Sequence, residues 1–118
     1  MYNVRDIDPY REEPGLRQVI FRGIDQMIGF TQIEPEKPDT EPHTHPYEQT
    51  NMLVDGRLDF LVDGEGIELE PYDTLTIPPE IPHTSRPIDG ETATLLAFWP
   101  LREDRLEGAT YQREFPDL

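Results

Sequence analysis

Prolines and glycines interrupt this chain so often that long regular elements are excluded over most of its length. The 118 residues contain 13 prolines and 8 glycines, and the segments between them are short runs with alternating or β-branched apolar character. Proline ends helices, whereas alternation with a period of two is typical of half-buried strands. The pattern predicts strands at about residues 16–24, 26–33, 47–54, 57–62, 67–70, 74–77, 83–86 and 92–99.

Two short segments combine residues that tolerate positive φ, as tight hairpins require. They are Asp55-Gly56 and the stretch that begins with Asp63-Gly64, and we expect a hairpin at each. No segment of about ten residues has a convincing helical apolar period. A sheet without a helical layer must bury its apolar face against another sheet or itself. The fold class expected is all-β, an antiparallel β-barrel or sandwich.

The length of the chain suits one domain. We expect residues 1–15 to form an extended N-terminal arm, residues 16–99 the β-barrel, and residues 100–118 a C-terminal arm. Apolar positions predicted to face outward, such as Met52 and Val54, favour a homodimer formed by strand addition or sheet-to-sheet contact.

Charge and composition exclude several kinds of partner and site. The net charge is −15 and the chain has a single lysine, Lys37, so a surface that tracks phosphates of nucleic acid is not expected. No apolar run is long enough to span a membrane and no secretory signal is visible, which favours a cytoplasmic protein. Without cysteine, metal ligands must be His, Asp, Glu or Gln. The acidic surface fits either simple solubility or adaptation to salt.

The three histidines of the chain fall in two places, PHTHPYEQ and IPPEIPH. On a strand, residues two apart point to the same side, so His43 and His45 could bind one ion, and Gln49 shares their parity. A further ligand must come from another strand. His83 fits, because the preceding prolines hold its backbone in a stiff, extended conformation.

The pattern His43-x-His45-x3-Gln49-x6-Gly56, followed by Pro78-x4-His83, resembles the two sequence motifs of the cupin superfamily. The resemblance runs over about residues 29–99. It implies a small single-domain cupin of type 2 with a β-barrel of the double-stranded jelly-roll kind. It also implies one divalent metal ion, bound by His43, His45, Gln49 and His83.

The sequence departs from the cupin motifs at five positions. Lys37 stands at the usual glycine of the first motif, and Gln49 replaces the usual glutamate ligand. In the second motif Tyr72, Glu80 and Pro87 stand where glycine, glycine and asparagine are common. These changes leave the expected fold in place but put the function in question.

Neutral ligands leave the double charge of the ion uncompensated, so the site should attract anions. Three imidazoles and one amide oxygen leave one or two coordination positions open, as in catalytic sites, and the ion could then act as a Lewis acid. Fe, Mn, Ni, Co, Cu and Zn all accept such ligands, and the sequence does not select among them.

The tail of the predicted barrel is similar to that of small cupins that linearise 4,5-unsaturated uronates. Arg102 matches their substrate-binding arginine, but Ala97 and Trp99 align with their acid–base aspartate and a phenylalanine. Tyr47 shares the predicted parity of the ligands, as Asn51 does, and is our candidate for proton transfer. Tyr47 and Arg102 are therefore the candidate catalytic residues.

These features leave two classes of function open. The first is a metal-dependent enzyme acting on a small sugar acid or carbonyl compound by Lewis-acid isomerase or lyase chemistry, with a cupin-type dioxygenase as its nearest rival. The second is a non-catalytic cupin that binds a small molecule. In each, the expected partner is a small, anionic molecule.

Overall fold

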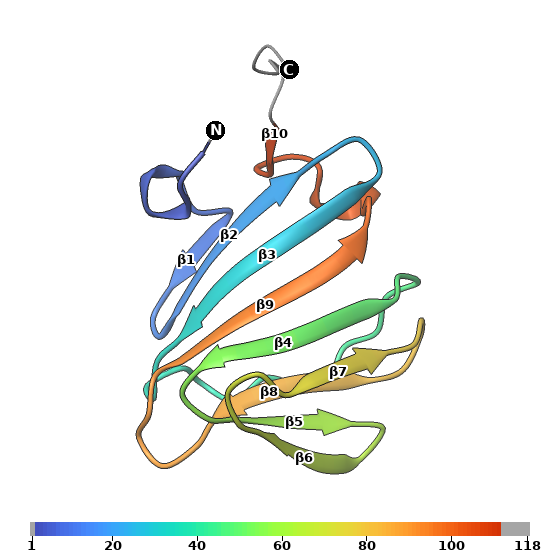
Figure 1. Ribbon diagram of the computed structural model, residues 1–118. Coiled ribbons are helices and arrows are strands. Elements are labelled where there is room, and N and C mark those ends of the chain that lie inside the picture. The colour runs from blue at the N-terminus through green and yellow to red at the C-terminus, as the bar shows by residue number, and fades with distance from the viewer. Residues whose placement is uncertain (1, 112–118) are drawn as a thin grey trace.

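The computed structural model describes residues 2–111, which form two β-sheets packed face to face (Figure 1). The larger sheet has the strand order β1-β2-β3-β9-β4-β7, and β10 pairs with β2; the smaller has the order β6-β5-β8. Neighbouring strands are antiparallel, except that β10 runs parallel to β2. The strands are β1 (Arg11–Glu13), β2 (Leu16–Arg22), β3 (Gln26–Ile33), β4 (Gln49–Asp55), β5 (Leu58–Val62), β6 (Glu65–Leu69), β7 (Thr74–Ile77), β8 (His83–Pro87), β9 (Ala93–Pro100) and β10 (Thr110–Tyr111).

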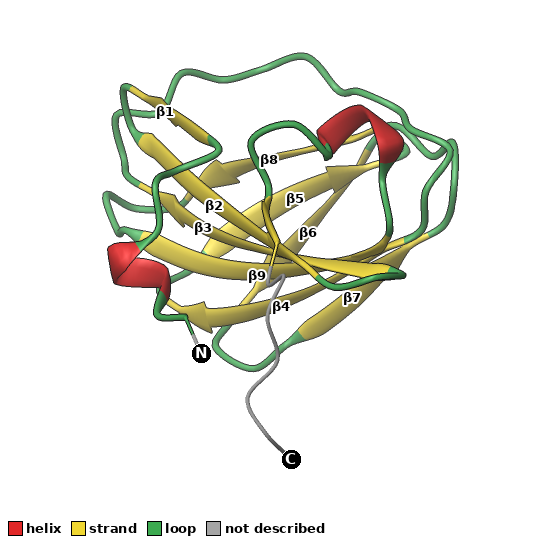
Figure 2. Ribbon diagram, turned by 90° about the horizontal axis from the view of Figure 1, so that it is seen from above, coloured by secondary structure: helices red, strands yellow, loops and turns green. Residues whose placement is uncertain are grey.

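The all-β prediction is confirmed. Each expected strand overlaps an observed one, and the helical turns of the described residues are two short 3-10 turns, η1 (Val4–Asp6) and η2 (Glu103–Arg105). Figure 2 shows both turns at the edges of the strand layers. None of the helices described here has the length and apolar character needed to cross a bilayer. β1 precedes residues 16–99 in the chain and β10 follows them, and both strands pair with β2.

One of the two expected hairpins is present and the other is wrong. Asp63 and Gly64 have φ of 49° and 84°, and they join β5 to β6 in a hairpin closed by the Val62 and Glu65 pair. Asp55-Gly56 instead carries the chain from β4 in the larger sheet to β5 in the smaller one. Turn residues fix the local backbone conformation, but they do not fix which strands pair afterwards.

Alternating burial turns one face of each sheet toward the other. Along β9, for example, Ala93, Leu95, Ala97 and Trp99 are buried while the residues between them are more exposed. Most of the buried apolar side chains form one cluster between the sheets, which includes Leu53, Leu58, Phe60 and Ile77. A second cluster contains Ile20, Met27, Ala97 and Trp99. Residues of both clusters line the cavity described below.

Gly56 gives a test of how the sheets are joined. Its φ is 83°, and a Cβ there would collide with the backbone of Thr92 and Ala93, whereas Gly64 has a similar φ but open space around it. We expect Gly56→Ala to lower the free energy of unfolding by about 3 kcal/mol or more, because strain and collision add. The matched Gly64→Ala variant should lose only about 1 kcal/mol. Urea unfolding measures both, and equal losses would contradict the crossover packing.

Candidate metal centre and its cavity

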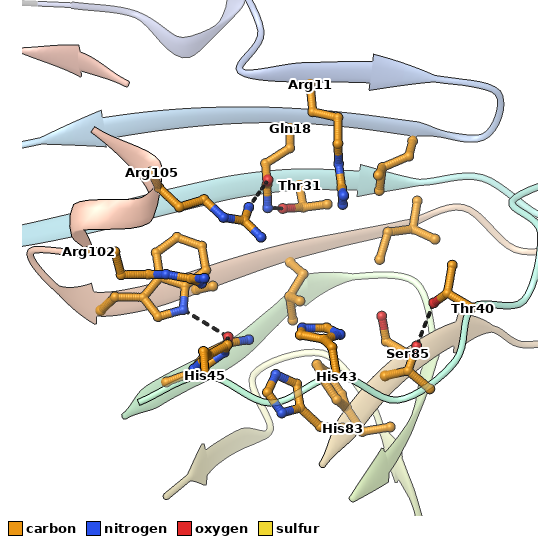
Figure 3. A pocket seen from close by; sticks show the side chains of 18 of the residues that line it. Arg11, Gln18, Thr31, Thr40, His43, His45, His83, Ser85, Arg102 and Arg105 are labelled. Carbon is orange, nitrogen blue, oxygen red and sulfur yellow. Dashed lines mark hydrogen bonds between the residues drawn. The ribbon is translucent and has the colours of Figure 1, made fainter. Parts of the chain in front are cut away.

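A cavity of about 430 Å³ opens between the two sheets, with the three histidines on its wall (Figure 3). Strands of both sheets and the segment between β3 and β4 contribute side chains to it. Its volume lies in the range of small-molecule sites. The remaining lining mixes apolar core residues with charged and polar groups, so the cavity offers both apolar surface and hydrogen-bonding groups.

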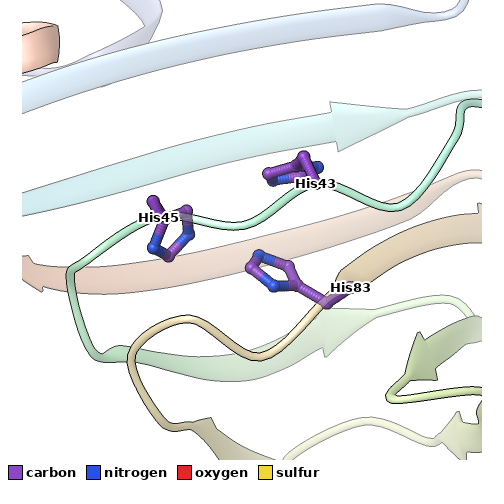
Figure 4. Close-up of side chains that lie close together, drawn as sticks. All are labelled: His43, His45 and His83. Carbon is purple, nitrogen blue, oxygen red and sulfur yellow. The ribbon is translucent and has the colours of Figure 1, made fainter.

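His43 and His45 lie in the irregular segment before β4, not on a strand as their spacing suggested. Two backbone hydrogen bonds of 3.0 Å join His43 and His83, and the Glu80 N–H donates to the His45 carbonyl at 2.8 Å. These contacts hold the segment against the start of β8. The three rings consequently face one another (Figure 4), and one nitrogen of each ring lies within 4.8 Å of one nitrogen of each of the others.

Hydrogen bonds fix the protonated nitrogen of His83. Its Nδ1–H donates to the carbonyl of Ile81 at 2.8 Å, because a carbonyl oxygen can only accept. The neutral ring then carries a lone pair on Nε2, and this buried atom has no hydrogen-bond partner among the described residues. A buried nitrogen left unpaired is costly, so its orientation toward the other two histidines fits a metal ligand.

The contact between His45 and Gln49 supports the same conclusion. His45 Nδ1–H donates to the Tyr47 carbonyl at 2.8 Å, which leaves a lone pair on Nε2. That nitrogen lies 3.2 Å from the Gln49 Oε1, which is also an acceptor. With neutral imidazole, two acceptors face each other without a proton between them. A cation bound by both would turn this unfavourable contact into a favourable one.

The side-chain amide of Gln49 is held in one orientation. The indole N–H of Trp99, which can only donate, reaches Gln49 Oε1 at 2.8 Å, and Gln49 Nε2 donates to Asn51 Oδ1 at 2.7 Å. Asn51 is fully buried and donates in turn to the Leu75 carbonyl at 3.3 Å. This chain of donors therefore turns the oxygen of Gln49, not its nitrogen, toward the histidines.

The electrostatic environment keeps the imidazoles neutral. Burial is the main cause that lowers the pKa of His45 and of His83. Although part of His43 is exposed, burial of its ring together with the charges of His83 and His45 lowers its pKa to about 4. Neutral imidazole is the form that binds metal, so all three rings are ready to bind a cation near pH 7.

The family model described as "Cupin domain" matches residues 29–99, more than half of the chain. This chain belongs to the cupin family. Among curated protein sequences, none matches it significantly.

Solved cupin-like structures share its fold. KdgF from Halomonas sp. is 25% identical, with a TM-score of 0.73 over 86% of this chain and 94% of its own. An RmlC-like cupin from Shewanella frigidimarina is 20% identical, with a TM-score of 0.71 over 87% of this chain and 92% of its own. The polyketide cyclase RemF from Streptomyces resistomycificus is 20% identical, with a TM-score of 0.70 over 91% and 89%. The cupin resemblance stated from the motifs is confirmed, and the two-sheet arrangement is the jelly roll.

Arg102 lines the cavity of this cupin, but its charge is already partnered. Its side chain is 3% exposed, and it donates from Nε and Nη2 to the two oxygens of Asp104 at 3.0 and 2.6 Å. The guanidinium also lies over the rings of Trp99 and Tyr47. These hydrogen bonds lower the pKa of Asp104 below its usual range, so the pair is charged near neutral pH.

Tyr47 precedes β4, so the strand parity that placed it on the face of the ligands does not apply. It is not among the residues that line the cavity, and its hydroxyl accepts a hydrogen bond from the Glu103 N–H at 3.2 Å. Its ring lies 5.4 Å from the Arg102 guanidinium. A role for Tyr47 in proton transfer stays a prediction.

Three further polar residues line the same cavity, although no motif pointed to them: Gln18, Thr31 and Arg105. Gln18 and Thr31 are buried at inward positions of β2 and β3, where the neighbouring inward residues are mostly apolar. A polar residue in such a row was the available signal. Arg105 follows β9 in the η2 turn, and no periodic pattern pointed to it.

Trp99→Phe tests the orientation of Gln49. The ring is kept but its N–H is lost, so the Gln49 amide can turn its oxygen away from the histidines. We expect the affinity for Zn²⁺ to fall about tenfold, as is usual when a partner of a metal ligand is removed. Competition with a chromophoric chelator measures it. Phe98→Leu, a change on the outer face of the same strand, is the control, and an unchanged affinity in Trp99→Phe would refute this role for the indole.

Proposed function

We propose that this cupin is a metal-dependent enzyme that acts on a small sugar acid or carbonyl compound by isomerase or lyase chemistry. The observation that carries the proposal is the convergence of unprotonated acceptors at the cavity wall, above all His83 Nε2 and the facing pair of His45 Nε2 and Gln49 Oε1. The cytoplasm is its proposed location.

His43, His45, His83 and Gln49 would hold one divalent transition metal ion. When bound, the ion would supply Lewis-acid polarisation of a substrate oxygen. None of these four ligands carries a negative charge, and Arg11, Lys37, Arg102 and Arg105 also line the cavity. The residues of the cavity therefore favour an anionic molecule, which agrees with a sugar acid.

The likeness to small uronate-linearising cupins, in ligand spacing and in the segment around Arg102, supports a sugar acid in particular. Asp104 occupies the Nε and Nη2 donors of Arg102, and a guanidinium has further N–H groups for a carboxylate. Arg102 would thus orient the acid. Tyr47, whose ring lies 5.4 Å from the Arg102 guanidinium, is the proposed proton donor to a part of the acid that extends past Arg102. Its hydroxyl accepts from the Glu103 N–H and keeps its own hydrogen.

A second candidate is a binding protein without turnover. It is favoured by Ala97, which is buried in the cavity wall at the position aligned with the acid–base aspartate of the uronate cupins. A methyl group transfers no proton. The same metal and the same cavity would then serve recognition alone.

The deciding experiment loads the protein with each candidate metal after element analysis of the purified protein, and offers unsaturated uronates, other sugar acids and diketones. We expect conversion of at least one of these acids, lost by at least about 100-fold in His83→Ala because the ion is lost. Gln49→Glu should retain the metal but bind the acid more weakly, because the added carboxylate cancels one positive charge.

Ser85→Ala, which also changes the cavity wall but removes no proposed ligand, is the control, and circular dichroism verifies that each variant is folded. Tight binding of an acid without conversion would replace the enzyme by the binding protein. Metal retained in His83→Ala would contradict the proposed ligand set.

We also propose that the protein is a homodimer formed through the outer face of its larger sheet. Ile28 and Phe98 face each other there across β3 and β9 and are 40% and 38% exposed. Phe30 and Met52 flank Leu96 on the same face, so the apolar surface continues across three strands. Such an exposed apolar patch is usual at an interface.

Light scattering after size exclusion tests the dimer. We expect twice the chain mass at micromolar concentration for the unchanged protein, and the single mass for Phe98→Glu, because a buried charge would oppose the contact. Asp89→Lys, an exposed charge change in the turn before β9, should stay dimeric. A monomeric unchanged protein would disprove this assembly.

A further inference from the structure

The cavity wall opposite the histidines carries basic side chains that the metal centre does not use. Figure 3 shows Arg11 and Arg105 on that side, next to Gln18 and Thr31, with the histidines across the cavity. Lys37 lines the same cavity, where its Nζ contacts the Ser85 carbonyl of β8. In a chain with 25 acidic and 10 basic residues, the lining contains four basic residues and only two carboxylates, those of Glu13 and Asp104. This reversal of the overall composition concentrates positive charge in the cavity.

Arg105 is held in place by buried polar groups. Its Nη1 donates to Gln18 Oε1 at 3.0 Å, and Gln18 Nε2 donates to Thr31 Oγ1 at 3.0 Å. Gln18 is 7% exposed and Thr31 is 5% exposed, so both are anchored in the sheet. The bond to Gln18 uses one of five guanidinium donors. In residues 2–111 no carboxylate lies within 4 Å of the Arg105 guanidinium, whereas Arg102 has Asp104.

Lys37 is the single lysine of the chain and stands where the cupin motif usually has glycine. Its Nζ donates to the carbonyls of Pro38 and Ser85 at 3.3 Å, and the described residues place no carboxylate within 4 Å of it. Burial lowers the pKa of Lys37 and the charge of Arg11 lowers it further, while the carboxylates of Asp39 and Glu13 raise it. Glu13 also lies 3.8 Å from the Arg11 guanidinium. Two cations that repel each other at a cavity wall would both be stabilised by an anion between them.

We propose that Arg105, Lys37 and Arg11 bind a second anionic group of the ligand, so that this cupin selects a small acid with an anion at each end. The inference rests on the proposed function for the end that faces the histidines. Arg105 can offer a planar pair of N–H donors to a carboxylate or a phosphate, and Thr31 lies beside it as a hydroxyl donor. A singly charged acid would leave this wall unused.

Three six-carbon probes test the second subsite: gluconate with one carboxylate, glucarate with one at each end, and 6-phosphogluconate with a phosphate at the far end. Calorimetric titration uses protein loaded with Zn²⁺. We expect glucarate or 6-phosphogluconate to bind about tenfold more tightly than gluconate, or better, as charged hydrogen bonds allow. Which of the two binds more tightly identifies the anionic group.

Arg105→Gln should reduce the ratio of the affinity for the tighter-binding dianion to that for gluconate to about one, because the contact with the distal anionic group is lost. Gln18→Glu gives the same test with almost no change in shape, since its carboxylate would pair with Arg105. Arg86→Gln is the control: it removes an equal charge from an exposed side chain that is paired with Asp59 and lies outside the cavity lining.

A preference that survives both Arg105→Gln and Gln18→Glu would overturn the proposal, as would equal binding of all three probes or no binding of any. The same titrations on His83→Ala separate this proposal from the proposed function. If the enzyme assay fails but the preference exists and depends on Arg105, the second subsite stands without the enzyme. If sugar acids are converted but no preference is found, only the second subsite falls.

Discussion

Two hydrogen bonds between the backbones of His43 and His83 connect the segment before β4 to the first residue of β8. That segment has no regular sheet partner elsewhere, so this bridge and the bond from Glu80 to His45 decide where its histidines point. Because the bridge uses main-chain atoms only, the imidazole rings stay free to face each other. The mutual placement of the three histidines therefore depends on how the smaller sheet contacts the segment before β4.

Packing on the inner face of the larger sheet determines the direction of the Gln49 side chain, the proposed fourth ligand. A Cβ at Gly29 would lie 2.7 Å from the Trp99 ring, so the absence of a side chain at Gly29 gives the indole its space. The indole N–H then reaches Gln49, and Asn51 takes the other end of the same amide. The close contact between Gly29 and the Trp99 ring thus helps to fix the orientation of the Gln49 amide, which is held by two hydrogen bonds. Stability and site geometry are coupled at this point of the fold.

Charge is distributed in opposite ways inside and outside the cavity. The chain carries a net charge of −15, yet the proposed ligands are neutral and four basic side chains lie around them. Within the cavity, Asp104 is held by Arg102, which reduces the negative charge open to a ligand. The effective dielectric constant in a partly closed cavity is lower than at the surface. The basic side chains of the cavity therefore interact more strongly with a charged ligand than surface charges do. An anionic ligand would meet an attractive interior once it passes the acidic exterior.

The sequence by itself determined the strands, the jelly-roll family and the three histidines, because these depend on local period, on turn residues and on a motif with fixed spacing. It also identified Gln49 and Arg102 as candidates. Only the tertiary structure decided that Asp55-Gly56 joins two sheets, that Tyr47 lies beside Arg102 outside the cavity lining, and that Arg105 rests on Gln18 and Thr31 within it. Strand parity extends only as far as a regular strand, and β4 begins at Gln49. The contact between Gln18 and Arg105, 87 positions apart, follows from how the η2 turn after β9 folds back onto β2, and no local pattern in the chain encodes it.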